Sequence, residues 1–501
     1  MKSKPNGEGD LPHTRKVDTA ARVVKNSAAM FAAAALAKGG GLIVTILVAR
    51  YLGASSLGVY AVVLALALLL EVLSPLGQQE VVVRAIARDR SLLFSHWVNA
   101  SAATLLFAFV FSIILVFIAQ LTNLGPAGTV AIYVAAAGLP LGGLNFVAQA
   151  VLQGFERMHY QTIGALVGRV LGLLVLWVLL ESGAGIWSTF VGRAVFQLTS
   201  LLILGRAILE HTKRNNLPRD WHPRLAVCRA TISTSIPFAI QRFFADGLIR
   251  VNIIILPLLV TLETVGLFNA AYQITQTIAM IIPIVMMAIL PVFSRSFKRN
   301  PKKSGILADQ TLRFLLILVF PFVFIVTIVA DKIIHLLYGT GYEASVPVLQ
   351  LVIWSQVFLA ADSVMKQSMI ASENERAMVW RSAISVTANI ALTITLSKFY
   401  GLFGIAAAVV IASAFLLAMD AHFVAKHISR TNWPQAVGKP FLSAALAGIV
   451  AFLLMGHGWA LLLSMTVAAY LAFLLLLKAF TMEELSIFQQ LFRRLLGRAD
   501  G

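Results

Sequence analysis

The feature that most limits the fold of this chain is a succession of apolar windows, each about 20 residues long. A helix needs about 20 apolar residues to cross a bilayer core, and such windows recur along almost the whole sequence. Since 59% of the residues are hydrophobic and only 12% are charged, against roughly 25% charged in soluble domains, we predict an all-α integral membrane protein. Fourteen spans are expected, at about residues 26–51, 57–80, 95–120, 128–152, 160–181, 185–206, 232–258, 264–293, 311–331, 344–369, 377–398, 402–425, 438–456 and 459–479.

The basic residues predict the orientation of these spans. The chain has 40 Lys and Arg against 22 Asp and Glu, an excess that could indicate a nucleic-acid partner. With a cytoplasmic N-terminus, however, only Arg50, Lys332 and Lys398 fall in outer segments, as the positive-inside rule expects. We therefore expect both termini to be cytoplasmic, and anionic lipids rather than nucleic acid to meet the basic loops. The first apolar run continues past Lys38 to Val48, longer than the core of a signal peptide, which predicts an uncleaved helix.

Motifs of enzymes and metal sites are missing from the sequence. A single cysteine, Cys228, rules out an internal disulfide and a cysteine zinc cluster. The chain has no Walker-type glycine loop, no His-Glu-x-x-His pair and no Gly-x-Ser-x-Gly elbow. We predict a transporter without a cofactor, and coupling to H⁺ or Na⁺ remains open.

The chain carries an internal repeat. Gly58-Val59-Tyr60-Ala61 corresponds to Gly266-Leu267-Phe268-Asn269, 208 residues later, and "LQGFERMHYQ" (152–161) corresponds to "IASENERAMV" (370–379). The repeat predicts two six-helix bundles of the same orientation, and transporters built in this way place the substrate between the bundles. The expected division is a cytoplasmic tail (1–25), an N-lobe (26–206), a linker (207–231), a C-lobe (232–425), two added helices (438–479) and an amphipathic cytoplasmic tail (480–501).

Three motifs carry a family resemblance: "ARYLGASSLGVYAV" between the first two spans, "VVVRAIARDRS" after the second and "QGFER" after the fourth. With the two bundles and the added pair, the chain resembles the polysaccharide and lipid-linked oligosaccharide flippases of the multidrug/oligosaccharidyl-lipid/polysaccharide (MOP) exporter superfamily. This resemblance implies a V-shaped two-lobe fold like that of multidrug (MATE) transporters. It also implies alternating access in the bacterial inner membrane and export of an undecaprenyl-pyrophosphate-linked oligosaccharide for exopolysaccharide, O-antigen or capsule assembly. The polymerase and chain-length machinery would be partners. Lipid II flippases are relatives that typically have Asp where this chain has Gly58, which argues against that substrate.

Five cations lie well inside the predicted spans, away from their ends, where a charge costs several kcal/mol and normally faces protein or a wet cavity. We expect Lys38, Arg169, Arg193 and Arg242 near mid-depth and Arg250 nearer the outer side. Arg offers paired donors to phosphate oxygens and Lys a point charge, which together suit a pyrophosphate. The uncharged polar residues expected to contact the glycan are Asn145, Gln149, Gln273 and Gln276.

Structural roles compete with these assignments. Arg242, Asp246 and Arg250 are spaced i, i+4, i+8 and could neutralise one another, or Lys38 could pair with Asp246. Arg169 and Arg193 have no acidic partner evident in the sequence and are the stronger ligand candidates. Glu71 and Asp246 are candidates for ion coupling, although Glu71 could equally be the partner of a cation. Two further interpretations are that Asp362 and Lys366 form a local ion pair and that Arg50 extends to the headgroups.

Two other functions stay open. A cation-coupled multidrug antiporter of the same fold should line its cavity with carboxylates and aromatic residues, so the basic residues weigh against it. A membrane glycan polymerase usually has a large external loop, whereas the outer loops predicted here are short.

Overall fold

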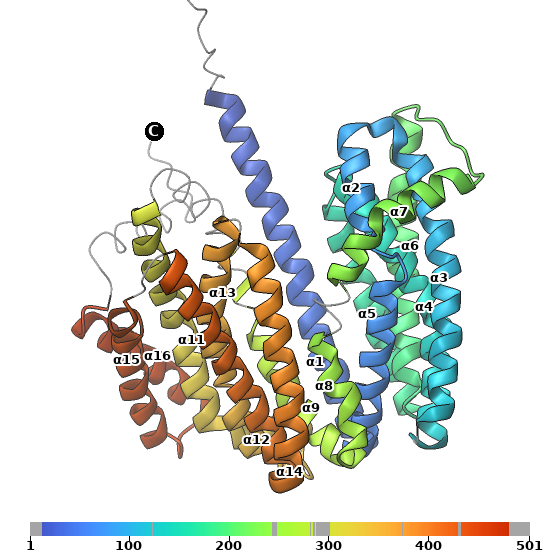
Figure 1. Cartoon of the computed structure of the whole chain (residues 1–501). Coiled ribbons are helices and arrows are strands. Elements are labelled where there is room, and N and C mark those ends of the chain that lie inside the picture. The colour runs from blue at the N-terminus through green and yellow to red at the C-terminus, as the bar shows by residue number, and fades with distance from the viewer. Residues whose placement is uncertain are drawn as a thin grey trace, which may run out of the picture. The chain divides into compact units, whose positions relative to one another are not determined.

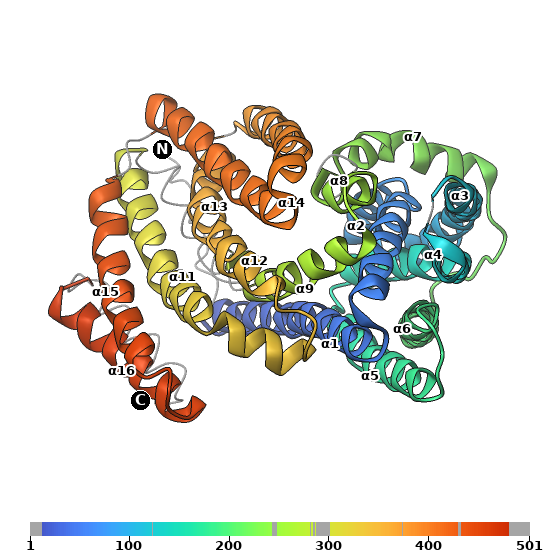
Figure 2. The same cartoon turned by 90° about the horizontal axis from the view of Figure 1, so that it is seen from below.

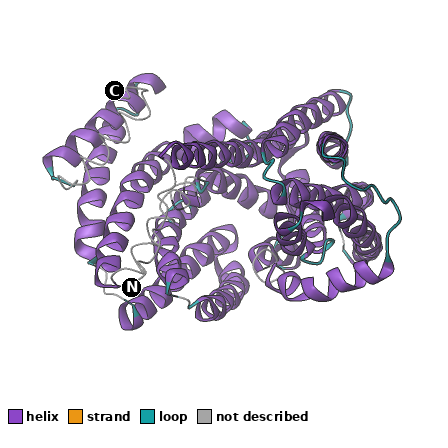
Figure 3. Ribbon diagram, turned by 90° about the horizontal axis from the view of Figure 1, so that it is seen from above, coloured by secondary structure: helices purple, strands orange, loops and turns teal. Residues whose placement is uncertain are grey.

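The structure, a computed structural model, consists of helices joined by short connections. It describes residues 13–122, 124–242, 248–280, 282–283, 286, 301–372, 374–428 and 432–479, and among these it contains no strand (Figure 3). Of residues 13–38, 121, 241–242, 248–249, 251–252, 301–304, 375–376, 379 and 460 it describes the helical backbone alone. The prediction of an all-helical chain is confirmed for the described residues.

The chain divides into two compact units. Unit 1 comprises residues 1–44 and 62–250, and unit 2 comprises residues 45–61 and 251–501. This division departs from the predicted lobes in two places. Residues 45–61 belong to unit 2, although they come from the first predicted lobe, and residues 232–250 belong to unit 1, although they come from the second.

In unit 1, pairs of long helices lie side by side. The helix α3 (Leu93–Leu121) packs against α4 (Gly125–Gly154), α5 (His159–Glu181) packs against α6 (Ser188–Arg214), and α6 also packs against α4 (Figures 1 and 2). Most of α1 (His13–Leu73) also belongs to this unit, as does α8 (Leu248–Ile255) up to residue 250. The short α2 (Gln78–Arg88) packs against α4 and α7 (Leu225–Arg242), and η1 (Arg90–Leu92) leads into α3.

Apart from residues 45–61 of α1, unit 2 consists of helices from the second half of the chain. The helix α11 (Pro301–Tyr338) packs against α13 (Ser355–Ala371) and α15 (Trp433–Leu453), and α15 packs against α16 (Trp459–Leu476) (Figure 1). The helix α9 (Leu262–Ile278), which follows η3 (Leu256–Leu258), packs against α12 (Ser345–Val352), and α13 packs against α14 (Glu375–His427).

Two glycines interrupt the longest helices. Gly53 in α1 has φ 80° and Gly401 in α14 has φ 53°, left-handed values that glycine adopts without a Cβ penalty. The spans predicted at 26–51 and 57–80 lie on either side of Gly53, and those at 377–398 and 402–425 on either side of Gly401. Among the described residues nine helices are long and apolar enough to cross a membrane, so a multi-pass chain is confirmed and the count of fourteen spans stays a prediction. Within the predicted tail, α1 already begins at His13.

A reciprocal contact joins the two glycines that mark the repeat. A Cβ on Gly58 would lie 1.8 Å from the Leu262 carbonyl oxygen, and a Cβ on Gly266 would lie 1.9 Å from the Ala54 carbonyl oxygen. Both contacts lie within unit 2. Ala54 and Leu262 are separated by 208 residues, as are Gly58 and Gly266. The glycine of each repeat therefore contacts the same position of the other repeat, as in an interface with two-fold symmetry.

Arg50 connects the bend of α1 to the end of α11. Its guanidinium donates hydrogen bonds to the Leu337 carbonyl, at 2.8 Å, and to the Leu336 carbonyl. These are carbonyls of the last helical turn, which have no partner within their own helix. The exposed Arg50 side chain thus caps α11, a role that the sequence interpretation, contact with headgroups, did not include.

Candidate functional site

Close backbone contact between α5 and α6 positions the cations of unit 1. A Cβ on Gly172 would lie 2.5 Å from the Gly192 carbonyl oxygen, and one on Gly168 would lie 2.6 Å from the Phe196 carbonyl oxygen. Small residues allow membrane helices to approach in this way. Arg169 directly follows Gly168, and Arg193 directly follows Gly192. The packing of the two helices therefore fixes the backbone positions of both arginines.

Arg193 forms an ion pair with Glu71. Its Nη2 donates to Glu71 Oε2 at 2.7 Å, and the two side chains are 21% and 7% exposed. The interpretation that Arg193 has no acidic partner is wrong, because α6 brings it to a carboxylate 122 residues away in the sequence. The alternative interpretation of Glu71, as the partner of a cation, is confirmed. Neither buried charge is left uncompensated, which would cost several kcal/mol.

The carboxyl group of Glu71 rests on the backbone of α4. A Cβ on Gly142 would lie 2.2 Å from Glu71 Cδ and 2.6 Å from Gln197 Nε2, so a larger residue would push both side chains from these positions. The helix α4 is tied to α6 at the same level, since Asn145 Nδ2 donates to the Gln197 carbonyl at 2.6 Å and to the Leu141 carbonyl at 3.1 Å. Glu71 is therefore held between two connected helices.

A small cavity adjoins this ion pair. Its volume is about 10 Å³, and it lies between side chains of α1, α4 and α6. A volume of roughly 10–15 Å³ is what a single water molecule requires. The cavity itself therefore has room for about one water beside Arg193 and Glu71. The lining residues are Ala67, Glu71, Ala135, Gly138, Phe190, Arg193 and Gln197.

Arg169 lies between α1 and α6. Its guanidinium carbon is 4.4 Å from the centre of the Phe196 ring, within the range of a cation–π interaction. A Cβ on Gly40 would lie 2.6 Å from Arg169 Cδ, so the stem of the arginine packs against α1. Arg169 and Arg193 are thus placed on adjacent helices of one unit.

The remaining predicted residues are placed less completely. The side chains of Lys38 and Arg242 and the whole of Asp246 lie outside the described residues, as do the predicted Lys38–Asp246 pair and the stack on Asp246. Arg250 lies on α8 with a half-buried side chain. The polar candidates Gln149 on α4 and Gln273 and Gln276 on α9 are half-buried, and Gln276 donates to the Tyr272 hydroxyl. Their contact with a glycan stays a prediction.

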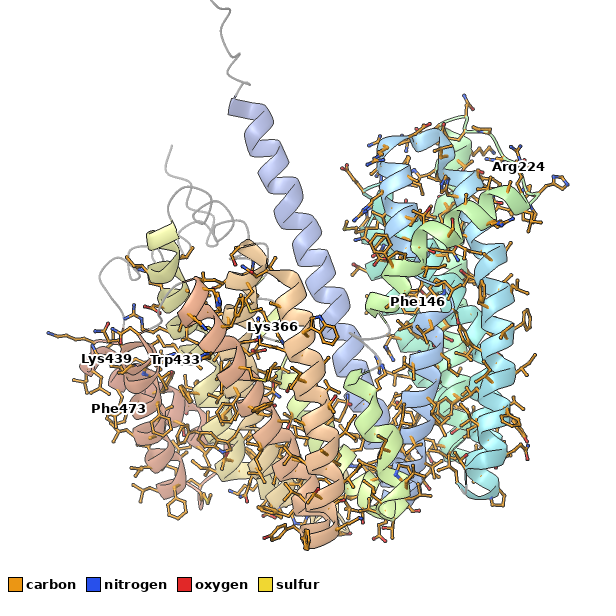
Figure 4. All side chains as sticks on the ribbon, viewed as in Figure 1. Phe146, Arg224, Lys366, Trp433, Lys439 and Phe473 are labelled. Carbon is orange, nitrogen blue, oxygen red and sulfur yellow. The ribbon has the colours of Figure 1, made fainter. Side chains whose placement is uncertain are left out.

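Unit 2 contains a second buried ionic cluster, on α13 and α14. Lys366 Nζ lies 2.7 Å from Asp362 Oδ2, which confirms the predicted local pair (Figure 4 labels Lys366). Arg381 Nε donates to Asp420 Oδ1 at 2.6 Å, and the carboxyl groups of Asp362 and Asp420 lie close to each other. The two aspartate side chains are 2% and 0% exposed. We name these four residues the C-unit cluster.

Sequence reasoning missed half of the C-unit cluster. Asp420 lies in the apolar run "FLLAMDAHFV", and a carboxylate inside such a run is itself a signal of a paired or functional charge. Arg381 lies near the start of the span predicted at 377–398 and was not singled out as a charge inside the membrane. Among the described residues no group of three or more His, Cys, Asp or Glu side chains is arranged to hold a metal ion.

An acidic residue organises the linker before α7. Asp220 accepts hydrogen bonds from the His222 backbone N–H at 3.0 Å and from Arg224 Nη2 at 2.9 Å (Figure 4 labels Arg224). The hydrogen bond from the His222 backbone, followed by that from Arg224, holds the pKa of Asp220 below its usual range. The Arg224 backbone N–H donates to Asn99 Oδ1 at 2.6 Å, which ties this linker to α3.

Family models match most of the chain. A model described as polysaccharide biosynthesis protein matches residues 23–297, and a model described as lipid II flippase MurJ matches residues 167–481. Each covers more than half of the 501 residues. No curated protein matches the chain.

Solved structures of transporters share the fold. A structure of the lipid II flippase MurJ in an inward closed conformation superposes with a TM-score of 0.73 at 14% identity, covering 95% of this chain and 100% of that one. An inward-facing multidrug resistance MATE transporter of the MOP superfamily superposes with a TM-score of 0.65 at 14% identity, covering 77% and 93%. A MOP superfamily transporter from Pyrococcus furiosus gives 0.56 at 13% identity, covering 81% and 95%.

Proposed function

The chain belongs to the flippases of the multidrug/oligosaccharidyl-lipid/polysaccharide exporter superfamily, and from this premise we propose that it moves an undecaprenyl-pyrophosphate-linked oligosaccharide from the inner to the outer leaflet by alternating access. The product would enter exopolysaccharide, O-antigen or capsule assembly in the bacterial inner membrane. A polymerase and chain-length machinery would use it there. Coupling to H⁺ or Na⁺ belongs to the same proposal.

Arg193 is the residue on which we base the choice of substrate. It is a permanent cation, partly buried among apolar helices, and it lines a cavity. Keeping a charge there costs free energy that a purely structural role does not require, since an apolar pair of similar volume often serves as well. A pyrophosphate group supplies the opposite charge, and guanidinium binds its oxygens through paired hydrogen bonds.

Two further observations support the proposal. Arg169 lies on the neighbouring helix and provides a second guanidinium for a group that carries at least two negative charges. The reciprocal packing of Gly58 and Gly266 supports the duplicated two-bundle arrangement on which alternating access depends. We therefore assign pyrophosphate binding to Lys38, Arg169, Arg193, Arg242 and Arg250.

A lipid II type substrate is the second candidate, because the MurJ family model matches residues 167–481. The packing at Gly58 opposes it. The resemblance expects an aspartate at this position in lipid II flippases, whereas a Cβ here would lie 1.8 Å from the Leu262 carbonyl oxygen. Measuring how fast the protein, reconstituted in proteoliposomes, flips each of the two lipid-linked glycans would distinguish the candidates.

The test is export of polysaccharide by variants of the two arginines. We expect Arg193→Ala or Arg169→Ala to abolish export while the protein remains in the membrane. The matched control is Arg206→Ala, since Arg206 lies on the same helix as Arg193, is also paired with a glutamate, and is 82% exposed. Unimpaired export by both Arg193→Ala and Arg169→Ala would refute the assignment.

A double variant separates loss of function from loss of folding. Arg193→Ala leaves Glu71 buried without its partner, which destabilises the protein by itself. Glu71→Gln/Arg193→Gln removes both charges and retains two amides that can hydrogen-bond each other. We expect this variant to reach wild-type levels in the membrane and to export no polysaccharide.

A further inference from the structure

The ion pair of Glu71 and Arg193 stands in the way of the pyrophosphate that we propose as ligand. The Nη2 atom of Arg193 is occupied by Glu71 Oε2 at 2.7 Å, and the adjoining cavity, at about 10 Å³, has room for about one water. The guanidinium has five N–H donors, and the structure gives Nη2 to Glu71. Because the cavity beside it is too small for a phosphate group, a phosphate that binds Nη2 takes the place of the carboxylate. Glu71 and the ligand compete for one guanidinium.

Among the residues whose side chains the structure describes, Arg193 is the cation that pairs with Glu71. The helix α4, on which the carboxyl rests, has no charged residue anywhere between Gly125 and Gly154. Arg193 is the charged group that α6 directs at Glu71, and Arg169 on α5 has its guanidinium over the Phe196 ring. Lys38, on the first part of α1, has a side chain outside the described residues.

A displaced Glu71 would be a buried carboxylate without its partner. Its side chain is 7% exposed, and an ionised carboxylate in such surroundings costs several kcal/mol, so that a group of this kind takes up a proton instead. Protonation consumes one H⁺ and leaves a neutral carboxylic acid. The carbonyl oxygen of the carboxylic acid can still accept from Gln197 Nε2, the amide nitrogen that lies beside Glu71 at Gly142.

We propose that Glu71 and the pyrophosphate exchange places on Arg193, so that binding of the ligand is accompanied by uptake of one proton at Glu71. This inference rests on the proposed function and specifies how the same site is regulated. The cation is never exposed unpaired in either state, because the carboxylate holds it before binding and the phosphate holds it afterwards. Release of the ligand returns the proton and restores the ion pair.

Thermodynamic linkage gives the exchange a measurable signature. When binding takes up one proton, the association constant falls about tenfold for each unit by which the pH rises. A pyrophosphate ester also changes its own protonation, so the contribution of Glu71 is the difference between the wild type and Glu71→Gln. Because Gln cannot ionise and competes less strongly for Arg193, this variant should bind more tightly at alkaline pH.

The experiment is isothermal titration calorimetry of the purified full-length protein with farnesyl pyrophosphate. Titrations in two buffers of different ionisation enthalpy, at pH 7 and pH 8, give the number of protons taken up. We expect the wild type to take up about one proton more than Glu71→Gln. Its affinity should fall about tenfold more than that of the variant between the two pH values. Glu71→Asp, which still titrates, should take up protons as the wild type does.

The control is Glu210→Gln, since Glu210 also pairs with an arginine of α6 but is 57% exposed; it should take up as many protons as the wild type. Equal proton uptake by the wild type and Glu71→Gln, with binding intact, would overturn the exchange and leave the proposed function standing. Binding that survives unchanged in Glu71→Gln/Arg193→Gln, or no binding by the wild type, would overturn both.

Discussion

The C-unit cluster allows a sharp prediction about stability. Arg381 Nε donates to Asp420 at 2.6 Å, and the Asp420 side chain is fully buried beside the carboxyl group of Asp362. Arg381→Leu would leave two adjacent carboxyl groups with Lys366 alone. Removing one partner of a buried ion pair costs about 3–5 kcal/mol, which is about two to four powers of ten in the ratio of folded to unfolded protein.

The opposite single variant should cost less. In Asp420→Leu the guanidinium of Arg381 remains 13% exposed, keeps the Phe423 ring at 3.9 Å and keeps its contact with Met369 Sδ at 3.3 Å. We expect a loss of about 1–3 kcal/mol, because a long side chain can also carry its charge toward water. The short, buried carboxyl groups of Asp362 and Asp420 cannot reach water in this way.

The double variant Arg381→Leu/Asp420→Leu tests the reasoning. Replacement of a buried pair by apolar residues of similar volume is often neutral, so we expect stability within about 1 kcal/mol of the wild type and a coupling free energy of at least about 3 kcal/mol. Reversible unfolding of the purified protein in mixed micelles by dodecyl sulfate measures each free energy. Lys398→Leu, an exposed position on α14, is the control, with a change within about 0.5 kcal/mol. A double variant whose loss equals the sum of the two single losses would refute the prediction.

Two other predictions concern the contact of Gly58 with Gly266 and the hydrogen bonds of Asp220. Gly58→Ala and Gly266→Ala should each lower the free energy of unfolding by about 1–3 kcal/mol or more, because the new Cβ would lie within 1.9 Å of a carbonyl oxygen. Gly438 has open space around it, so Gly438→Ala should leave the free energy of unfolding unchanged. Equal losses at all three positions would contradict this reasoning. The hydrogen bonds that lower the pKa of Asp220 should protect the His222 amide from hydrogen exchange at every pH above about 3.9, the pKa of aspartate in the unfolded chain. Protection should disappear as the pH falls through the lower pKa of Asp220 in the folded protein. Protection that is lost already at pH 5, or that is retained in Asp220→Asn, would show that another contact holds the linker.

The helices themselves follow from the sequence, because crossing a bilayer requires long apolar segments that hydropathy reveals directly. Each predicted span coincides with a helix over at least part of its length. The sharp bend of α1 at Gly53, with helix directly before and after it, was not predictable in this way. A glycine between two apolar runs signals a turn, and only the three-dimensional structure shows that helix resumes at once on either side.

The partners of the buried charges could not be derived from the sequence. Glu71 and Arg193 are 122 residues apart, and Arg381 and Asp420 are 39 apart, so each pair depends on how helices pack rather than on spacing along one helix. The local pair of Asp362 and Lys366 was predictable because residues four apart share a helix face. Gly58 and Gly266 were identified as markers of a repeat, yet their mutual contact depends on the fold of unit 2.

The assignment of residues 45–61 to unit 2 has a consequence for how the chain is made. Gly58 is synthesised 208 residues before Gly266, the glycine against which it packs. At roughly 5–20 residues per second, a ribosome takes about 10–40 s to cover that distance. During this interval the surface of residues 45–61 that later contacts Gly266 is covered by lipid or by another protein. Translation speed and the insertion machinery therefore act on the second unit well before most of its own sequence exists.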